Sequence, residues 1–237
     1  MKPKILAIIP ARSGSKAIKN KNIKLLGKYP LIYYTITQAL KSKIFDKIVI
    51  STDSKKYLKL AEKYGVSSPF LRPKKLSLSN SLATDTIYDA VKKTEKYYKT
   101  KYDLICMLQP TAPFREVKDF TSILKIMKKN YKMCDSIISV VDVDNFNPYK
   151  MKTINKNKLI DYKFWPIENP PRQSLPKTYI VNGAFYFFKR DSFMKNKSFK
   201  GKYSIPYIMP KERSVNIDGL IDFELAKIVL KKLKIKF

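Results

Sequence analysis

Histidine is absent from the 237 residues of this chain. The absence excludes histidine general bases, nucleophilic triads that depend on histidine, and histidine metal ligands. Any acid–base or metal chemistry must therefore use carboxylate, amide, hydroxyl and ammonium groups.

Cysteine and glycine are also scarce. Cys106 and Cys134 are the only cysteines and are too few for a disulfide framework, so we expect a reduced, cytoplasmic protein. The six glycines form neither a Walker loop nor a G-x-G-x-x-G fingerprint. No apolar run reaches 18 residues, so we expect no transmembrane helix and no membrane partner. We interpret the apolar start at 1–14 as a first strand rather than a signal peptide, since no small-residue cleavage site follows it.

The charge is strongly unbalanced, with 49 basic against 19 acidic residues and a net charge of +30. Such a balance is typical of proteins that bind nucleic acid. Arginine supplies only six of the basic residues, however, and arginine is the residue that reads bases and phosphates in a bidentate way. We therefore favour lysine-rich solvated faces and expect no nucleic-acid partner, with nucleic-acid binding kept as the alternative class.

Apolar patterning alternates between strand and helix periods along most of the chain. This alternation predicts an α/β fold with a mostly parallel sheet and helices on both faces. The expected strands are 4–11, 47–53, 102–110, 134–143 and the start of 179–193, and the expected helices are 30–43, 54–65, 84–99, 117–130 and 220–237. Ser54 is the expected N-cap of the second helix, and we interpret Asp53 and Asp222 as further capping residues.

The alternation stops at 144–178, which is rich in proline, asparagine and aromatic residues. An irregular segment of this length is usually functional or part of an interface. No linker or internal repeat is visible, so we predict one domain over 1–237 that carries 144–178 as an insertion. We assign Phe164 and Trp165 to an interface core.

The segment "IIPARSGSKAIKNKN" (8–22) joins a predicted buried strand to a basic turn. Ligands of open α/β sheets bind at the carboxyl ends of the strands. Backbone N–H groups of Ser13, Gly14 and Ser15, helped by Lys16 and Lys21, can therefore bind a polyphosphate. The residues by themselves also fit a solvated, lysine-rich loop, and both interpretations stay open at this point.

Seven motifs together resemble one enzyme family. In order they read "IIPARSGSKAIKNKNIKLLGKYPLIYYTI", "FDKIVISTDS", "PFLRP", "LQPTAPFR", "PPRQSLP", "NGAFYF" and "IDFELA". The chain from 5 to about 229 is similar to the N-acylneuraminate cytidylyltransferases, which include the CMP-legionaminic and CMP-pseudaminic acid synthetases. The resemblance implies a Rossmann-like three-layer nucleotidyltransferase fold, in which the anomeric hydroxyl of a nonulosonic acid attacks the α-phosphorus of CTP with Mg²⁺ assistance.

The resemblance also implies roles for particular residues. Arg12 and Lys21 correspond to the triphosphate clamp, with Lys16 and the backbone of Ser13, Gly14 and Ser15 beside them. The remaining assignments are Asn22 and Arg72 near the ribose and cytosine, Gln109 near sugar and nucleotide, Lys150 and Arg172 facing the sugar acid, and Asn182 in the pocket floor. The counterpart of 144–178 crosses into a partner subunit, which implies a homodimer.

The metal site departs from the family pattern. Relatives usually carry two aspartates around one residue, whereas this chain has Asn216 and Asp218 in "SVNIDG". Asparagine offers a neutral oxygen, so the resemblance implies Mg²⁺ held by Asp218 and Asn216 more weakly than by two carboxylates. Asp218 joins Arg12 and Lys21 as an expected catalytic residue. Ile180 stands where some relatives have an arginine.

Two alternative enzyme assignments remain. One is a related nucleotidyltransferase that acts on another sugar acid, such as the eight-carbon acid of lipopolysaccharide. The other is a relative that binds nucleotide but is catalytically impaired because of Asn216. The segment 76–85 fits no family motif, and we expect it to line the acceptor pocket.

Overall fold

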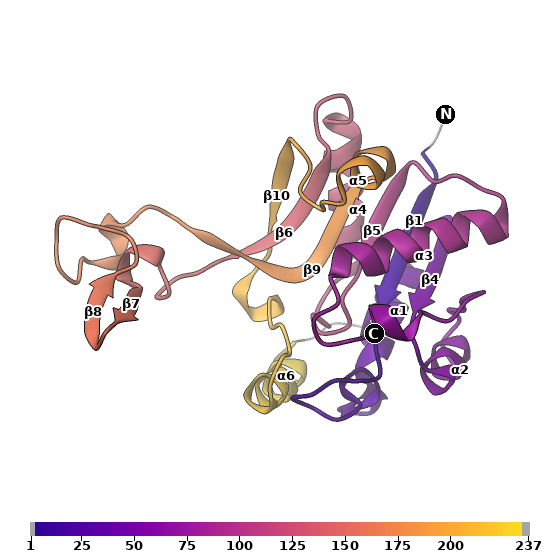
Figure 1. The fold of residues 1–237 in the computed structure, drawn as a ribbon, viewed down its shortest axis with the longest axis horizontal. Coiled ribbons are helices and arrows are strands. Elements are labelled where there is room, and N and C mark those ends of the chain that lie inside the picture. The colour runs from indigo at the N-terminus through magenta and orange to yellow at the C-terminus, as the bar shows by residue number, and fades with distance from the viewer. Residues whose placement is uncertain (1–2, 234–237) are drawn as a thin grey trace.

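A computed structural model describes residues 3–233 of the chain. Its centre is a six-stranded sheet in the order β10-β6-β9-β5-β1-β4 (Figure 1). Every neighbouring pair is parallel except the two that β9 makes with β5 and β6. The strands are β1 (Ile5–Pro10), β4 (Lys47–Ser51), β5 (Leu104–Met107), β6 (Ser136–Asp142), β9 (Tyr179–Lys189) and β10 (Ser204–Ile208).

Helices cover both faces of this sheet. Successive side chains of a strand point to opposite faces, and β1 is apolar throughout, so both of its faces need to be buried. Ile5, Ala7 and Ile9 pack in one cluster with α1 (Leu31–Ser42), α2 (Lys55–Lys63) and α4 (Val117–Lys129). Leu6 and Ile8 pack in a second cluster with α3 (Ala83–Tyr98) and α5 (Arg190–Asn196). The predicted three-layer α/β fold with a mostly parallel sheet is confirmed.

The last helix, α6 (Leu220–Lys232), forms a third cluster with β2 (Leu25–Leu26) and the start of α1. Asp222 caps this helix, as predicted, by accepting hydrogen bonds from the backbone N–H groups of Asp218 and Gly219 at 2.9 and 2.7 Å. Positions 234–237 of the predicted closing helix lie outside the described residues. The pattern did not predict β10, α5, or the short pair of β2 with β3 (Tyr29–Pro30).

The segment 144–178, which we call the arm, extends away from the sheet between β6 and β9 (Figure 1). The strand–helix alternation stops here, as the sequence indicated, but the arm contains an antiparallel hairpin of β7 (Lys152–Asn155) and β8 (Lys158–Asp161) that the sequence did not predict. Lys156 and Asn157 join these strands with positive φ values of 44° and 63°, as a type I′ turn requires. Among residues 3–233, no helix is long and apolar enough to cross a membrane.

Candidate functional site

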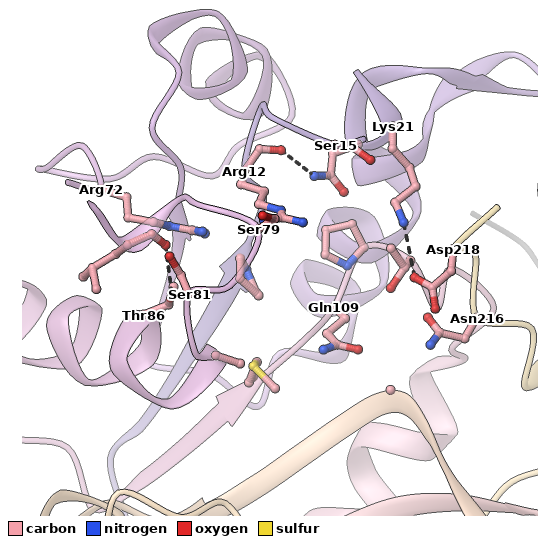
Figure 2. Close-up of a pocket in the computed structure, with 18 of the residues that line it drawn as sticks. Arg12, Ser15, Lys21, Arg72, Ser79, Ser81, Thr86, Gln109, Asn216 and Asp218 are labelled. Carbon is pink, nitrogen blue, oxygen red and sulfur yellow. Dashed lines mark hydrogen bonds and ion pairs between the residues drawn. The ribbon is translucent and has the colours of Figure 1, made fainter. Parts of the chain in front are cut away.

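A cleft of about 450 Å³ opens at the carboxyl ends of β1 and β5 (Figure 2). One wall comes from the loop after β1, here called the β1 loop (residues 11–22), and the opposite wall comes from the segment before α6. Predicted site residues that line it are Arg12, Ser15, Lys21, Asn22, Arg72, Gln109, Asn216 and Asp218. Residues from four separate parts of the sequence therefore meet where ligands of open α/β sheets bind.

The start of the β1 loop is bound by a carboxylate. Asp53 accepts hydrogen bonds from the backbone N–H of Ser13 at 2.9 Å and from its Oγ at 2.8 Å. The N–H of Ser15 donates back to the carbonyl of Ser13 at 3.0 Å. Our expectation that Ser13 and Ser15 present free backbone donors to a phosphate is therefore corrected. Their N–H groups are already satisfied within the chain.

Gly14 and Lys16 lie exposed and outside the cleft lining. Asp53 also does not cap α2, contrary to prediction, since Ser54 accepts from the N–H of Tyr57 at 3.4 Å. The wrong assignment arose because Asp53 is close in sequence to α2, whereas the adjacent parallel strand β1 brings Ser13 equally near in space.

The end of the β1 loop presents its lysine to the far wall. Lys21 Nζ donates to the carbonyl oxygen of Ile217 at 2.7 Å and lies 3.3 Å from Asp218 Oδ1 (Figure 2). The buried side chain of Asn22 donates to the carbonyl of Arg12 at 3.0 Å, so in this chain it closes the loop on itself. Lys21 is thus placed between the loop and the segment that holds Asp218.

The two cleft arginines are held differently. Arg12 donates from Nη1 to the carbonyl of Leu78 at 2.6 Å, which ties the β1 loop to segment 76–85. Arg72 is buried and donates from Nε to Ser51 Oγ at 3.1 Å. Burial lowers the Arg72 pKa to about 10, an effect that Arg12 increases and the Asp53 carboxylate opposes. Arg72 stays a cation at neutral pH and keeps one edge of the cleft positive.

Segment 76–85 lines the cleft, and its expected place at the acceptor stays a prediction. Its contribution comes from Leu76, Leu78, Ser79, Ser81 and Ala83. Ser81 fixes the local turn by accepting from the N–H of Leu78 at 3.0 Å and donating to the carbonyl of Lys75 at 3.0 Å. Backbone and hydroxyl groups from this segment therefore lie beside Arg12 in the cleft lining.

The cleft floor is formed by Gln109, Gly183 and Asn216. Gly183 has a φ of 74°, and a Cβ added there would come within 2.4 Å of Gln109 Oε1 and 3.6 Å of the Asn216 amide. Glycine is favoured at this point by its backbone conformation, and a side chain there would displace the Gln109 amide. The two side-chain amides can therefore approach the same part of the floor (Figure 2).

Arg115 holds the loop that carries Gln109. It is fully buried and donates to the carbonyl oxygens of Gln109, Ala112 and Ala184 at 2.6 to 2.7 Å and to Thr35 Oγ1 at 3.0 Å. Burial lowers its pKa to about 9. Sequence reasoning gave Arg115 no role, although its place inside "LQPTAPFR" was a usable signal.

A divalent cation fits the residues around Asn216. Its Oδ1 is buried and has no hydrogen-bond partner, an arrangement that a cation would satisfy. Asp218, two residues on, is 79% exposed in its side chain and adds one carboxylate. Within 3–233 there is no group of three or more aspartate, glutamate or cysteine side chains placed to hold a metal. The donor set is thus small, with one charge, and oxygen ligands from outside the chain would have to complete the coordination.

A buried ion pair fixes the segment that bears Asn216 and Asp218. Arg213 pairs through both terminal nitrogens with Asp119 at the start of α4, and Tyr207 donates to Asp119 Oδ1 at 2.8 Å. Asp119 is fully buried and Arg213 nearly so. Ile217 then donates its N–H to the carbonyl of Thr111 at 2.8 Å, so the segment is held at both ends.

Three residues expected at the sugar lie elsewhere in this chain. The Asn182 side chain is buried, accepts from Ser139 Oγ at 2.6 Å and donates to Ser214 Oγ at 3.0 Å, so it supports the floor without lining the cleft. Lys150 lies on the arm beside a separate cavity of about 640 Å³. Arg172, also on the arm, pairs with Asp144. Within one chain, the arm does not bring Lys150 and Arg172 to the cleft.

The sequence matches the family model described as "Cytidylyltransferase" over residues 6–231. It is 36% identical to the N-acylneuraminate cytidylyltransferase of Escherichia coli O18:K1:H7 over 98% of this chain. The chain spans 53%, or about half, of that relative. It is 35% identical to the CMP-N,N'-diacetyllegionaminic acid synthase of Campylobacter jejuni over 95% of this chain and 94% of that protein.

Among solved structures, one similar chain is CMP:2-keto-3-deoxy-manno-octonic acid synthetase complexed with CTP. The TM-score is 0.67 at 15% identity, and the alignment covers 97% of this chain and 99% of the other. At that identity the likeness extends to the fold alone.

Proposed function

This chain belongs to the cytidylyltransferase family, and from that premise we propose that it transfers CMP from CTP to the anomeric hydroxyl of a nonulosonic acid. Pyrophosphate is the second product. The observation that carries the proposal is the cleft, where Arg12 and Lys21 from the β1 loop face Gln109, Asn216 and Asp218. Cationic side chains on one side of the cleft thus face amide and carboxylate oxygens on the other. Transfer from a triphosphate requires such an arrangement, with cations for the phosphates and oxygens for a metal ion.

The triphosphate binds on the basic side of the cleft. Arg12 and Lys21 contact its oxygens, and Lys16 adds charge from the exposed loop tip. These cations offset the charge that develops on the departing pyrophosphate. Asn22, from the β1 loop, and Arg72, from the segment after α2, also line the cleft, and we assign them to the nucleoside side, with Arg72 supplying a fixed buried charge.

The opposite wall holds the metal. Asp218 and Asn216 bind Mg²⁺, which when present offsets negative charge on the α-phosphate and its leaving group. Lys21 also contacts Asp218, at 3.3 Å, and so links the triphosphate side of the cleft to the metal side. Gln109, on the floor between the two walls, orients the acceptor and the α-phosphate by hydrogen bonding.

The arm of a second copy completes the acceptor side. Supporting this are the projection of the arm and the exposure of its apolar side chains, with Phe146, Ile154, Leu159 and Phe164 each 71 to 78% exposed. Exposed apolar groups of that size favour an interface. Lys150 and Arg172 then provide cations for the carboxylate of a sugar acid bound in the partner's cleft. Asn182, which is buried, is removed from the set of direct contacts.

The acceptor class follows from the relatives that match at 35 to 36% identity over nearly the whole chain. The eight-carbon alternative is supported only by a fold likeness at 15% identity. A cytoplasmic location stays a prediction, based on the two buried, unpaired cysteines.

The test is pyrophosphate release with CTP, Mg²⁺ and a panel of sialic, legionaminic, pseudaminic and eight-carbon sugar acids. ATP, GTP and UTP serve as nucleotide controls. We expect release with CTP and one nine-carbon acid. Release only with the eight-carbon acid would assign the alternative acceptor, and CTP binding without release from any acid would assign a catalytically impaired relative.

A further inference from the structure

Two side chains that follow β4 hold the β1 loop near its two ends. Asp53 binds Ser13 through both carboxylate oxygens, at 2.9 Å to N–H and 2.8 Å to Oγ. Tyr57, on the first turn of α2, donates its hydroxyl proton to Asn20 Oδ1 at 3.3 Å. The loop is therefore bound to a neighbouring strand–helix unit as well as to its own strand.

The sheet register explains why Asp53 reaches this loop. Pro10 of β1 lies opposite Ser51 of β4, and Ala11 continues the pairing by donating to the Ser51 carbonyl at 2.9 Å. Two residues beyond the paired positions, Ser13 and Asp53 leave the sheet edge side by side. Asp53, which follows β4, can thus fix the point at which the β1 loop turns away from the sheet.

The composition of the loop explains why it needs external support. Residues 11–22 include Arg12, Lys16, Lys19 and Lys21 but no acidic residue, so their charges repel one another. Asn20 also has a positive φ of 56°, in the left-handed region that few non-glycine residues other than asparagine and aspartate adopt. Asp53 supplies a negative charge at the start of the loop, and Tyr57 holds Asn20 directly before Lys21.

Neither anchor lines the cleft. Each oxygen of Asp53 accepts a hydrogen bond from Ser13. Tyr57 is only 1% exposed, and burial together with the Asp53 charge raises its pKa to about 12, so the phenol stays a hydrogen-bond donor. Their position behind the loop, with neither residue in the cleft lining, indicates a purely positioning role.

We propose that Asp53, supported by Tyr57, is a positioning residue that presets the β1 loop for binding a triphosphate. The inference rests on the proposed function for the identity of the nucleotide. Its physical basis is preorganisation: a loop already held in its binding conformation loses less conformational freedom when the ligand arrives. Removing Asp53 should therefore weaken triphosphate affinity and leave the acceptor side unaffected.

The test compares Asp53→Asn with Asp46→Asn. Asp46 is a matched control, because its Oδ2 accepts from the N–H of Ile5 at 2.7 Å, at the opposite end of β1 and far from the cleft. For each variant we would measure the dissociation constants of CTP and of inorganic tripolyphosphate by calorimetry. Apparent KM values for CTP and for the sugar acid, and the thermal midpoint, complete the comparison.

For Asp53→Asn we expect about tenfold weaker binding of both CTP and tripolyphosphate, with the sugar-acid KM unchanged. Asp46→Asn should bind both ligands within about twofold of the wild type, whatever it does to the thermal midpoint. In the double variant with Ser13→Ala, the two losses should be less than additive, since Ser13→Ala removes the Oγ hydrogen bond to the carboxylate that Asp53→Asn also changes.

The inference would be overturned if Asp53→Asn bound both ligands with wild-type affinity, or if Asp53→Asn and Asp46→Asn weakened binding equally. Additive losses in the double variant would overturn it as well. Tripolyphosphate binding requires neither nucleobase nor acceptor, so this comparison decides the role of Asp53 even if the chain releases no pyrophosphate. A failure to release pyrophosphate would count against the proposed function alone.

Discussion

Lys21 and Asp218, which are 197 positions apart in the sequence, form an ion pair across the cleft at 3.3 Å. The lysine side chain is 12% exposed, whereas the aspartate side chain is 79% exposed. Lys21 is further held by the Ile217 carbonyl, so the chain keeps a cation beside the carboxylate expected to bind a metal. A metal ion must therefore either displace Lys21 from Asp218 or bind to Asp218 beside it, together with the triphosphate.

The first prediction concerns the missing carboxylate at the metal site. Asn216→Asp should lower the Mg²⁺ or Mn²⁺ concentration needed for half-maximal binding by about tenfold or more, since a second carboxylate raises affinity for a hard cation. The buried Oδ1 of Asn216 already faces a site without a partner, so the change needs little rearrangement. Manganese binding can be followed by electron paramagnetic resonance in the presence of CTP.

The control for added negative charge is Asn196→Asp, at the exposed end of α5 away from the cleft. This variant should bind manganese as the wild type does. Equal affinity in the wild type and Asn216→Asp would exclude position 216 from the metal site.

The second prediction concerns the arm and uses two inactive variants. Lys21→Ala removes a residue of the cleft, and Arg172→Ala removes one of the arm. If the arm completes the partner's site, a mixed dimer regains one intact site. Co-refolding equal amounts should then restore about a quarter of wild-type pyrophosphate release, because about half of the dimers are mixed and each has one working site.

The matched control mixes Lys21→Ala with Arg12→Ala. Both residues belong to the same cleft, so no mixed dimer contains an intact site and no activity should return. Recovery in the control, or none in the Lys21 and Arg172 mixture, would contradict an exchanged arm. Sedimentation velocity on the same samples reports whether dimers form.

The third prediction concerns the loss of folding stability at alkaline pH. Tyr34 is nearly fully buried, and burial, with smaller effects of Tyr33 and Tyr29, raises its pKa from 10.0 to about 12. The folded state therefore favours the protonated phenol. This contribution is fully present below pH 10 and is lost as the pH rises through about 12.

Tyr34→Phe cannot ionise at this position. The difference in unfolding free energy between wild type and this variant should be constant below pH 10 and should shift against the wild type between pH 10 and about 12. Urea unfolding at each pH measures it, with Tyr97→Phe at an exposed position as the control. A difference that stays constant through this pH range would contradict the assigned shift.

The fourth prediction concerns the Arg213–Asp119 pair. Arg213→Met should lower the free energy of unfolding by about 3–5 kcal/mol, because it leaves the buried Asp119 carboxylate without its cation. Lys227→Met breaks an exposed pair with Glu224 and should cost no more than about 0.5 kcal/mol. Urea unfolding of both variants tests this, and similar small losses would show that the buried pair contributes little.

Much of the fold could be predicted because its signals are local. The continuous apolar run at 5–10 indicated a buried parallel strand. Ser54 and Asp222 marked the starts of two helices by capping. Strand β10 escaped prediction because "SIPYI" contains a proline and is short, and it pairs only at the sheet edge. The hairpin in the arm escaped because both of its strands are exposed and show no alternating burial.

The candidate site divides in the same way. The sequence alone determined the residue types available at this cleft: no histidine, a basic loop after the first strand, and one carboxylate with one amide in "NID". Only the tertiary structure decided how they are used. Asp53 binds Ser13 instead of capping its own helix, Asn182 turns into the floor, and Lys21 reaches Asp218. Such contacts depend on strand order and register, which bring distant residues together and leave no local pattern in the sequence.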